Sequence, residues 1–194
     1  MNRICHQIWI QGDPPPHLVP DLFNLRTLNP DWRFYFWTND TILPLLSIFP
    51  DLLALYNSNV RGRGSEFTCK SDIARYLIVY LFGGLYLDCD FRCSAPFSEV
   101  LSDSDVMVVA DNSLAAFNWF PFLHKSKYGA YYFYSCHPKS QVLLSVLWFC
   151  QENPEKTKIG QALDRVIQRE GVIPRVAGSM SGQTTVPSRG VYLL

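Results

Sequence analysis

Two aspartates separated by one residue stand out in a chain that carries little charge. Asp88 and Asp90 follow the apolar residues LYL, where a buried strand would end. Alternate residues of an extended strand point to the same side, so we expect both carboxylates to face one way. Two such charges repel each other unless a cation lies between them, and carboxylate oxygens suit Mg²⁺ or Mn²⁺. The pair therefore predicts a metal site that could neutralise a diphosphate.

The residues before this pair set it apart from a chance occurrence. A second D-x-D, at residues 103–105, lies in a serine-rich stretch typical of a solvated loop, so the spacing alone is weak support. The first pair follows a helix predicted over residues 65–82 and a break at Gly83-Gly84. Apolar side chains recur in that helix at helical spacing: Phe67, Ile73, Ala74, Leu77 and Leu81. A helix, a glycine stop and a strand would thus position the two carboxylates.

The rest of the chain alternates strands with helices. Strands are predicted at residues 4–10, 32–37, 85–91 and 106–111, and an antiparallel strand at 130–136. Helices are predicted at residues 20–28, 42–59, 140–151 and 159–170. The second is expected to be interrupted by its prolines and to be capped by one of residues 39–41. This order is typical of an α/β fold, in which ligands bind beyond the carboxyl ends of the parallel strands.

The composition argues against several classes of protein. The 194 residues carry 17 basic and 17 acidic side chains and are 48% hydrophobic, which favours a folded domain. With zero net charge, we expect no nucleic acid partner. The six cysteines form no C-x-x-C pair, so we interpret them as small buried side chains in a reducing compartment rather than as a zinc site. We find no apolar run long enough for a membrane span.

Three stretches of the sequence resemble a known family. They are CHQIWIQG at residues 5–12, WRFYFWTND at 32–40 and SDIARYLIVYLFGGLYLDCD at 71–90. Together they are similar to the glycosyltransferases with a DXD sugar-binding motif, which include fungal outer-chain mannosyltransferases, capsular polysaccharide transferases and clostridial glucosylating toxins. The central block, S-D-x-x-R-x(10)-Y-x-D-x-D, is specific. A later helix matches the family's G-P-x-x-L pattern less well, because Gln161 replaces the proline.

The resemblance implies a fold and a domain organisation. The fold would be GT-A, the Rossmann-like fold of nucleotide-diphospho-sugar transferases, with a mixed sheet flanked by helices. We expect a single domain over residues 1–194, with a nucleotide-sugar-binding half at about 1–92 and an acceptor-side half at about 93–194.

The resemblance also implies roles for side chains of the first half. Trp9 would stack on the nucleobase, with core packing as the alternative, and Asn39 would reach the nucleoside. Ser71 and Asp72 would contact the donor, Asp72 through sugar hydroxyls. Arg75 lies about one turn further along the same helix face. It would meet the sugar or a neighbouring carboxylate, with a structural salt bridge as the alternative.

The D-x-D block would bind the metal and the nucleotide. Tyr86 would face the same side of the strand as Asp88, because the two are separated by one residue. Asp88 would bridge the ribose and the metal, and Asp90 would bind the metal directly. The catalytic residues implied are therefore Asp88, Asp90 and Arg75.

The acceptor side is expected after the next strand. Asp111 and Asn112 would line it, with a loop cap as the alternative for Asp111. Trp119 would offer an aromatic face to a sugar, with core packing as the alternative. His124 and His137 are lone histidines, and either could be a third metal ligand, although a structural role is commoner for such residues.

These inferences favour a metal-dependent, retaining hexosyltransferase. It would use Mn²⁺ or Mg²⁺ and a nucleotide sugar, a UDP-sugar in preference to GDP-mannose, with a glycan, polysaccharide or glycoprotein as acceptor. Two alternatives stay open: a non-catalytic nucleotide-sugar or carbohydrate-binding module, and a phosphohydrolase of the haloacid dehalogenase type. In the second, Arg92 stands where that family has Thr or Val.

The cellular setting is also an expectation. We favour the cytoplasm, including a host cytosol for a bacterial or viral enzyme, and the Golgi lumen if an N-terminal anchor was removed. The abrupt end at GVYLL suggests a fragment of a longer protein with further domains.

Overall fold

The computed structural model describes residues 2–58, 66–90, 92–93, 96–101, 107–110, 128–155, 159–170, 175–176 and 192–193. Its strands are β1 (Ile4–Ile8), β2 (Arg33–Trp37), β3 (Gly84–Leu87), β4 (Arg92–Cys93), β5 (Met107–Ala110), β6 (Tyr128–Ser135), β7 (Arg175–Val176) and β8 (Tyr192–Leu193). Its helices are η1 (Pro16–Leu18), α1 (Val19–Leu28), α2 (Asn39–Leu46), α3 (Pro50–Asn57), α4 (Glu66–Phe82), α5 (Phe97–Val100), α6 (Gln141–Glu152) and α8 (Ala162–Glu170). No helix within these ranges combines the length and the apolar character that a bilayer crossing requires.

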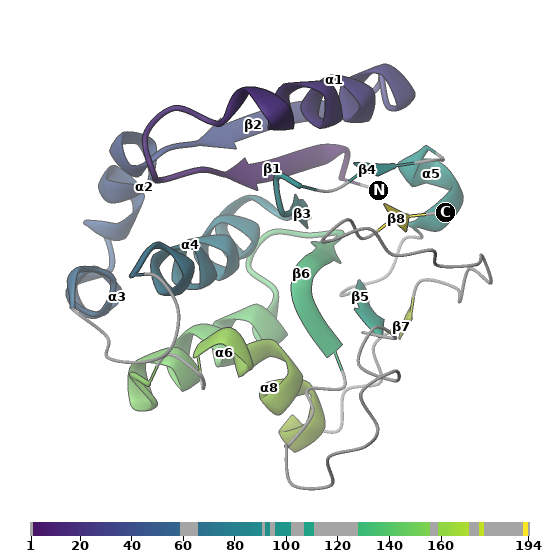
Figure 1. Ribbon diagram of the computed structural model, residues 1–194. Coiled ribbons are helices and arrows are strands. Elements are labelled where there is room, and N and C mark those ends of the chain that lie inside the picture. The colour runs from purple at the N-terminus through teal and green to yellow at the C-terminus, as the bar shows by residue number, and fades with distance from the viewer. Residues whose placement is uncertain are drawn as a thin grey trace, which may run out of the picture.

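One mixed sheet organises the described residues (Figure 1). Its strand order is β2-β1-β3-β6-β5-β7, and β4 pairs separately with β8. β1 runs parallel to both β2 and β3, whereas β6 lies antiparallel between β3 and β5. The predicted α/β arrangement, with parallel strands first and an antiparallel strand later, is confirmed. Because β1, β2 and β3 are parallel, their carboxyl ends lie at one edge of the sheet.

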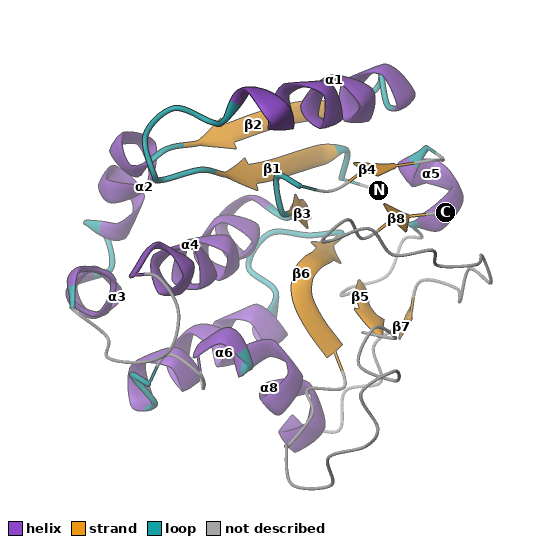
Figure 2. Cartoon of the chain, viewed as in Figure 1, coloured by secondary structure: helices purple, strands orange, loops and turns teal. Residues whose placement is uncertain are grey.

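Helices cover the sheet on both faces. Tyr86 of β3 belongs to a core shared with α2, α3, α4, α6 and α8, whereas its neighbours Leu85 and Leu87 belong to a core shared with α1 and α5. Figure 2 shows α4, α6 and α8 gathered on one side of the sheet. Both faces of β3 are thus buried, which explains why this strand is apolar at every position after its glycine.

Two glycines fix the passage from α4 into β3. Gly83 (φ +65°) and Gly84 (φ +88°) adopt left-handed conformations, which cost glycine little. A Cβ at Gly84 would lie 2.5 Å from the carbonyl oxygen of Ile4, so only glycine lets β3 approach β1 this closely. The glycine break predicted from the sequence is confirmed.

One prediction about the helices after β2 is wrong. The cap is Thr38 and not one of residues 39–41, and the Thr38 backbone N–H donates to the Oγ1 of Thr41 at 2.9 Å in a reciprocal capping box. The interruption by proline that was predicted within residues 42–59 is confirmed. The chain turns before Pro50, which begins α3, whereas Pro44 lies inside α2.

The prediction for the strand that carries the aspartates is also wrong. β3 ends at Leu87, and residues 89–90 form a turn. The alternation of an extended strand therefore does not orient Asp88 relative to Asp90. The side chain of Cys89, within the turn, holds this segment in place.

His6 is buried in β1 between two partners that fix its protonation. The indole N–H of Trp37 donates to its Nδ1 at 3.2 Å, so Nε2 carries the proton and donates to the Gly83 carbonyl at 2.8 Å. Burial lowers the pKa of His6 from 6.5 to about 4, and the hydrogen bond to Gly83 acts in the opposite direction. The histidine is therefore neutral in the folded protein at neutral pH.

We expect acid to destabilise the protein through His6. Because its pKa is lower in the folded chain, unfolding takes up a proton. This stability is present above pH 6.5 and is lost as the pH falls toward 4. Between pH 7.5 and pH 5 the loss is about 2 kcal/mol. Urea denaturation at both pH values measures it, and the pH dependence should shrink by that amount in His6→Asn. An equal pH dependence of stability in both proteins would contradict the lowered pKa of His6.

Candidate functional site

The parallel strands end at one edge of the sheet, and a predicted site residue follows each of them. Trp9 directly follows β1, Asn39 lies two residues beyond β2, and Asp88 directly follows β3. The backbone N–H of Trp9 donates to the carbonyl of Trp37 at 2.9 Å, which continues the pairing of β1 with β2 to this edge. The structure therefore brings residues from three separate stretches of the sequence to one edge.

Hydrogen bonds fix the side chains of Trp9 and Asn39. Trp9 is half-buried and is not among the described residues of either hydrophobic core. This argues against core packing, the alternative role considered for Trp9. Its indole N–H donates to the carbonyl of Asp13 at 3.2 Å. The hydroxyl of Tyr56 in α3 donates to the Oδ1 of Asn39 at 2.9 Å. Both side chains are thus oriented in advance, and their contacts with a nucleotide stay predictions.

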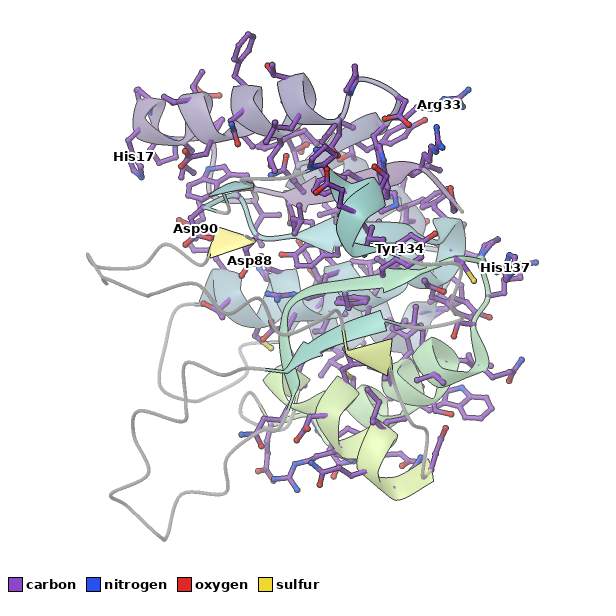
Figure 3. All side chains as sticks on the ribbon, turned by 90° about the vertical axis from the view of Figure 1, so that its right-hand side faces the viewer. His17, Arg33, Asp88, Asp90, Tyr134 and His137 are labelled. Carbon is purple, nitrogen blue, oxygen red and sulfur yellow. The ribbon has the colours of Figure 1, made fainter. Side chains whose placement is uncertain are left out.

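The residue between the two aspartates anchors the turn. Cys89 is buried, and its thiol donates to the carbonyl of Ile8 at 3.3 Å, which ties the turn to the end of β1. Burial, and then the charges of Asp88 and Asp90, raise the pKa of Cys89 to about 12, so it stays a protonated donor. Asp88 is half-buried and Asp90 is exposed, and Figure 3 shows both at the same edge of the molecule.

A buried arginine connects the aspartate of α4 to the aspartate that follows β3. Nη2 of Arg75 lies 2.7 Å from Oδ1 of Asp72, and Nη1 lies 3.6 Å from Oδ1 of Asp88. The guanidinium also lies over the ring of Tyr86, 4.8 Å from its centroid. Burial would lower the pKa of Arg75, but Tyr86, Asp72 and Asp88 raise it above its ordinary value. Arg75 is therefore charged, and it interacts with both carboxylates.

Comparison with known proteins identifies this constellation. The profile of the family described as a glycosyltransferase sugar-binding region containing a DXD motif matches residues 19–109, which include α4, β3 and both aspartates. This match and the relatives described next support a DXD glycosyltransferase family for this part of the chain.

Relatives with similar sequences come from a yeast and a virus. Inositol phosphoceramide mannosyltransferase 1 of Schizosaccharomyces pombe is 29% identical over 138 residues, which are 64% of this chain and 41% of the relative. An uncharacterized glycosyltransferase, L373 of Acanthamoeba polyphaga mimivirus, is 35% identical over 103 residues, 51% of this chain and 39% of the relative. The chain thus spans about four tenths of the length of these relatives.

A solved structure confirms the fold. The PaToxG glycosyltransferase superimposes with a TM-score of 0.65 over 87% of this chain and 68% of that chain, at 14% sequence identity. The predicted GT-A fold, a mixed α/β sheet flanked by helices, is therefore confirmed.

The segment that leads into α8 lies against α4 beside Asp72. The hydroxyl of Tyr76 in α4 donates to the carbonyl of Ile159 at 3.5 Å and holds this segment against α4. A Cβ at Gly160 would lie 3.3 Å from Oδ2 of Asp72, closer than an ordinary van der Waals contact. Gly160 therefore leaves room beside the carboxylate of Asp72. The resemblance of this segment to the family's G-P-x-x-L helix was the only sequence signal for it.

The remaining predicted residues fall into three groups. Ser71 lies on α4 beside Asp72, and its carbonyl accepts a hydrogen bond from Nε of Arg75 at 3.4 Å. His137 lies at the opposite edge of the molecule from Asp88 (Figure 3), so it is not a third ligand for a metal at the D-x-D turn. The acceptor-side residues Asp111, Asn112 and Trp119, together with His124, lie outside the described residues.

The chemistry of the donor set fits a shared cation. Asp88 and Asp90 offer the oxygen ligands that Mg²⁺ or Mn²⁺ takes, with water and phosphate completing the coordination. Among the described residues there is no group of three His, Cys, Asp or Glu side chains that could hold a metal alone. The site therefore fits a cation that protein and diphosphate hold together, and not a closed structural metal site.

Proposed function

We propose that the chain is a metal-dependent, retaining glycosyltransferase that moves a hexosyl group from a nucleotide-diphosphate sugar to a glycan, polysaccharide or glycoprotein. The observation that carries the proposal is the buried Arg75, which interacts with Asp72 on one side and with Asp88 of the D-x-D turn on the other. The match of residues 19–109 to the DXD glycosyltransferase family supports the reaction class, and the two carboxylates at the edge of the sheet support the metal.

The side chains of the site would have different roles in this reaction. Glycosyl transfer leaves negative charge on the departing diphosphate, and a divalent cation held by Asp88 and Asp90 would supply the charge that stabilises it. Asp72 would accept hydrogen bonds from sugar hydroxyls, in an orientation that Arg75 fixes through a 2.7 Å contact. We assign no general base, because retaining members of the family do not depend on one.

The donor is a choice between two nucleotide sugars. The D-x-D block favours a UDP-sugar by its resemblance. A mannosyl donor, GDP-mannose, is the second candidate, because two relatives from Schizosaccharomyces pombe are named inositol phosphoceramide mannosyltransferases. Their names also make an inositol-containing sphingolipid an acceptor to include in any screen.

Nucleotide release tests the proposal. The purified protein is incubated with UDP-glucose, UDP-galactose, UDP-N-acetylglucosamine or GDP-mannose, with Mn²⁺ or with a chelator, and released UDP or GDP is measured. We expect release from one of these donors only when the metal is present. Phosphate release from a phosphomonoester would instead support the phosphohydrolase alternative, and donor binding without turnover would support the binding module.

Replacing Trp9 tests the nucleotide end of the site. We expect Trp9→Ala to weaken nucleotide binding about tenfold, because stacking on a base contributes roughly 1–3 kcal/mol, and to change kcat much less. Calorimetric titration with UDP and with GDP measures the affinity. Trp148→Ala is the matched control, since Trp148 is an exposed tryptophan on α6. Unchanged affinity in Trp9→Ala would remove Trp9 from the site.

A further inference from the structure

A buried tyrosine holds the first aspartate of the D-x-D turn. The hydroxyl of Tyr86 donates to Oδ1 of Asp88 at 2.5 Å. Its ring is 2% exposed, lies 5.7 Å from the ring of Phe133 between centroids, and is covered by the guanidinium of Arg75 at 4.8 Å. Because the ring is enclosed on these sides, the hydroxyl has a fixed position, and so does the oxygen that it contacts.

Arg75 approaches the same oxygen. Its Nη1 lies 3.6 Å from Oδ1 of Asp88, the atom that already accepts the hydrogen bond from Tyr86. The hydrogen bond and the ion pair that other described side chains make with the Asp88 carboxylate therefore both involve Oδ1. A hydrogen-bond donor and a positive charge on one oxygen make it a poor ligand for a cation, because the cation would be repelled by the same charge.

We propose that Tyr86 and Arg75 reserve Oδ1 of Asp88, so that this aspartate offers a single oxygen to a metal and the site selects Mn²⁺ and Mg²⁺ over Ca²⁺. Mg²⁺ requires near-ideal octahedral geometry and takes one or two carboxylates plus water and phosphate. Ca²⁺ takes six to eight oxygens and often binds a carboxylate through both of them. A carboxylate limited to one oxygen therefore disfavours Ca²⁺. This inference rests on the proposed metal-dependent function and makes Tyr86 a positioning residue for it.

Tyr86→Phe tests the proposal without any turnover. The variant keeps the ring and removes only the hydroxyl, so Oδ1 of Asp88 becomes available to a metal. Binding of MnCl₂ and of CaCl₂ is measured by calorimetry on the protein alone and in the presence of UDP, with Mn²⁺ also followed by electron paramagnetic resonance. We expect the wild type to prefer Mn²⁺, and the preference over Ca²⁺ to fall about tenfold in Tyr86→Phe, a typical effect of removing a partner that orients a metal ligand.

The control is a second buried tyrosine of the same sheet. Tyr134 lies in β6, and its hydroxyl accepts a hydrogen bond from the backbone N–H of Asn2 at 2.9 Å, near the start of β1 and away from the turn. Tyr134→Phe should keep the metal preference of the wild type, although it also removes a buried hydroxyl. If Tyr86→Phe does not fold, the double variant Asp72→Asn with Arg75→Met removes the positive charge beside the same oxygen and should lower the preference in the same direction.

The outcomes separate this inference from the proposed function. If the wild type binds no Mn²⁺ with or without UDP, the metal-dependent function fails and the inference fails with it. If the wild type binds Mn²⁺ and Tyr86→Phe keeps the same preference over Ca²⁺, the inference is wrong and the proposed function stands. An equal fall in Tyr134→Phe would also overturn it, because the effect would then report a general loosening of the sheet.

Discussion

Asp90→Ala is expected to abolish metal-dependent release of nucleotide from the donor and to leave the fold intact. Asp90 is exposed in the turn after β3, so its side chain contributes little to the hydrophobic core. It is one of only two carboxylates that the D-x-D turn offers to a cation. Loss of a group that stabilises the transition-state charge typically costs about 10²-fold or more in rate, which corresponds to several kcal/mol.

Two measurements separate the loss of activity from loss of structure. Nucleotide release is compared between wild type and variant with saturating Mn²⁺, and thermal unfolding is followed for both. Asp51→Ala is the matched control, since Asp51 is an exposed aspartate in the first turn of α3. Full activity of Asp90→Ala would defeat the assignment of the metal site.

Arg75→Met is expected to destabilise the protein by about 3–5 kcal/mol, the typical cost of breaking a buried ion pair. Arg75 and Asp72 are each 6% exposed, and removal of the guanidinium leaves the Asp72 carboxylate buried without its 2.7 Å partner. The double variant Asp72→Asn with Arg75→Met should recover part of this loss, because no uncompensated charge stays buried. Activity should be absent in both variants.

Urea denaturation measures both variants. The urea concentration at the midpoint of unfolding should fall. The dependence of the unfolding free energy on urea concentration should not change if the denatured state is unaffected. Arg165→Met is the control, because Arg165 is exposed on α8, and we expect a change within about 0.5 kcal/mol. A double variant that is no more stable than Arg75→Met would argue against an ion pair as the source of the loss.

The sequence predicted the central helix, its glycine stop and the following strand because these features are local. Apolar spacing set the extent of α4, and the close approach of Gly84 to Ile4 explains why glycine was needed there. The charged residues of α4 and the turn were also predicted to share a site. The structure shows that Arg75 contacts both Asp72 and Asp88.

The contacts that the sequence did not predict are non-local. Nothing near residue 85 indicates that its antiparallel neighbour is β6, about fifty residues later, or that Ile159 lies against Tyr76. The turn at residues 89–90 was missed because its stabilising contact, from the Cys89 thiol to Ile8, joins positions 81 residues apart. Alternation along a strand was the wrong reason to expect the two aspartates on one side.

The insertion of β6 between β3 and β5 has a consequence for biosynthesis. A ribosome that has released the first hundred residues has delivered β1, β2, β3 and α4, but β3 still lacks its antiparallel partner. Unpaired strand edges of this kind favour aggregation until the missing strand arrives. β3 therefore stays without its antiparallel partner until residues 128–135 have emerged, and we expect the nascent chain to be most prone to aggregation during this interval.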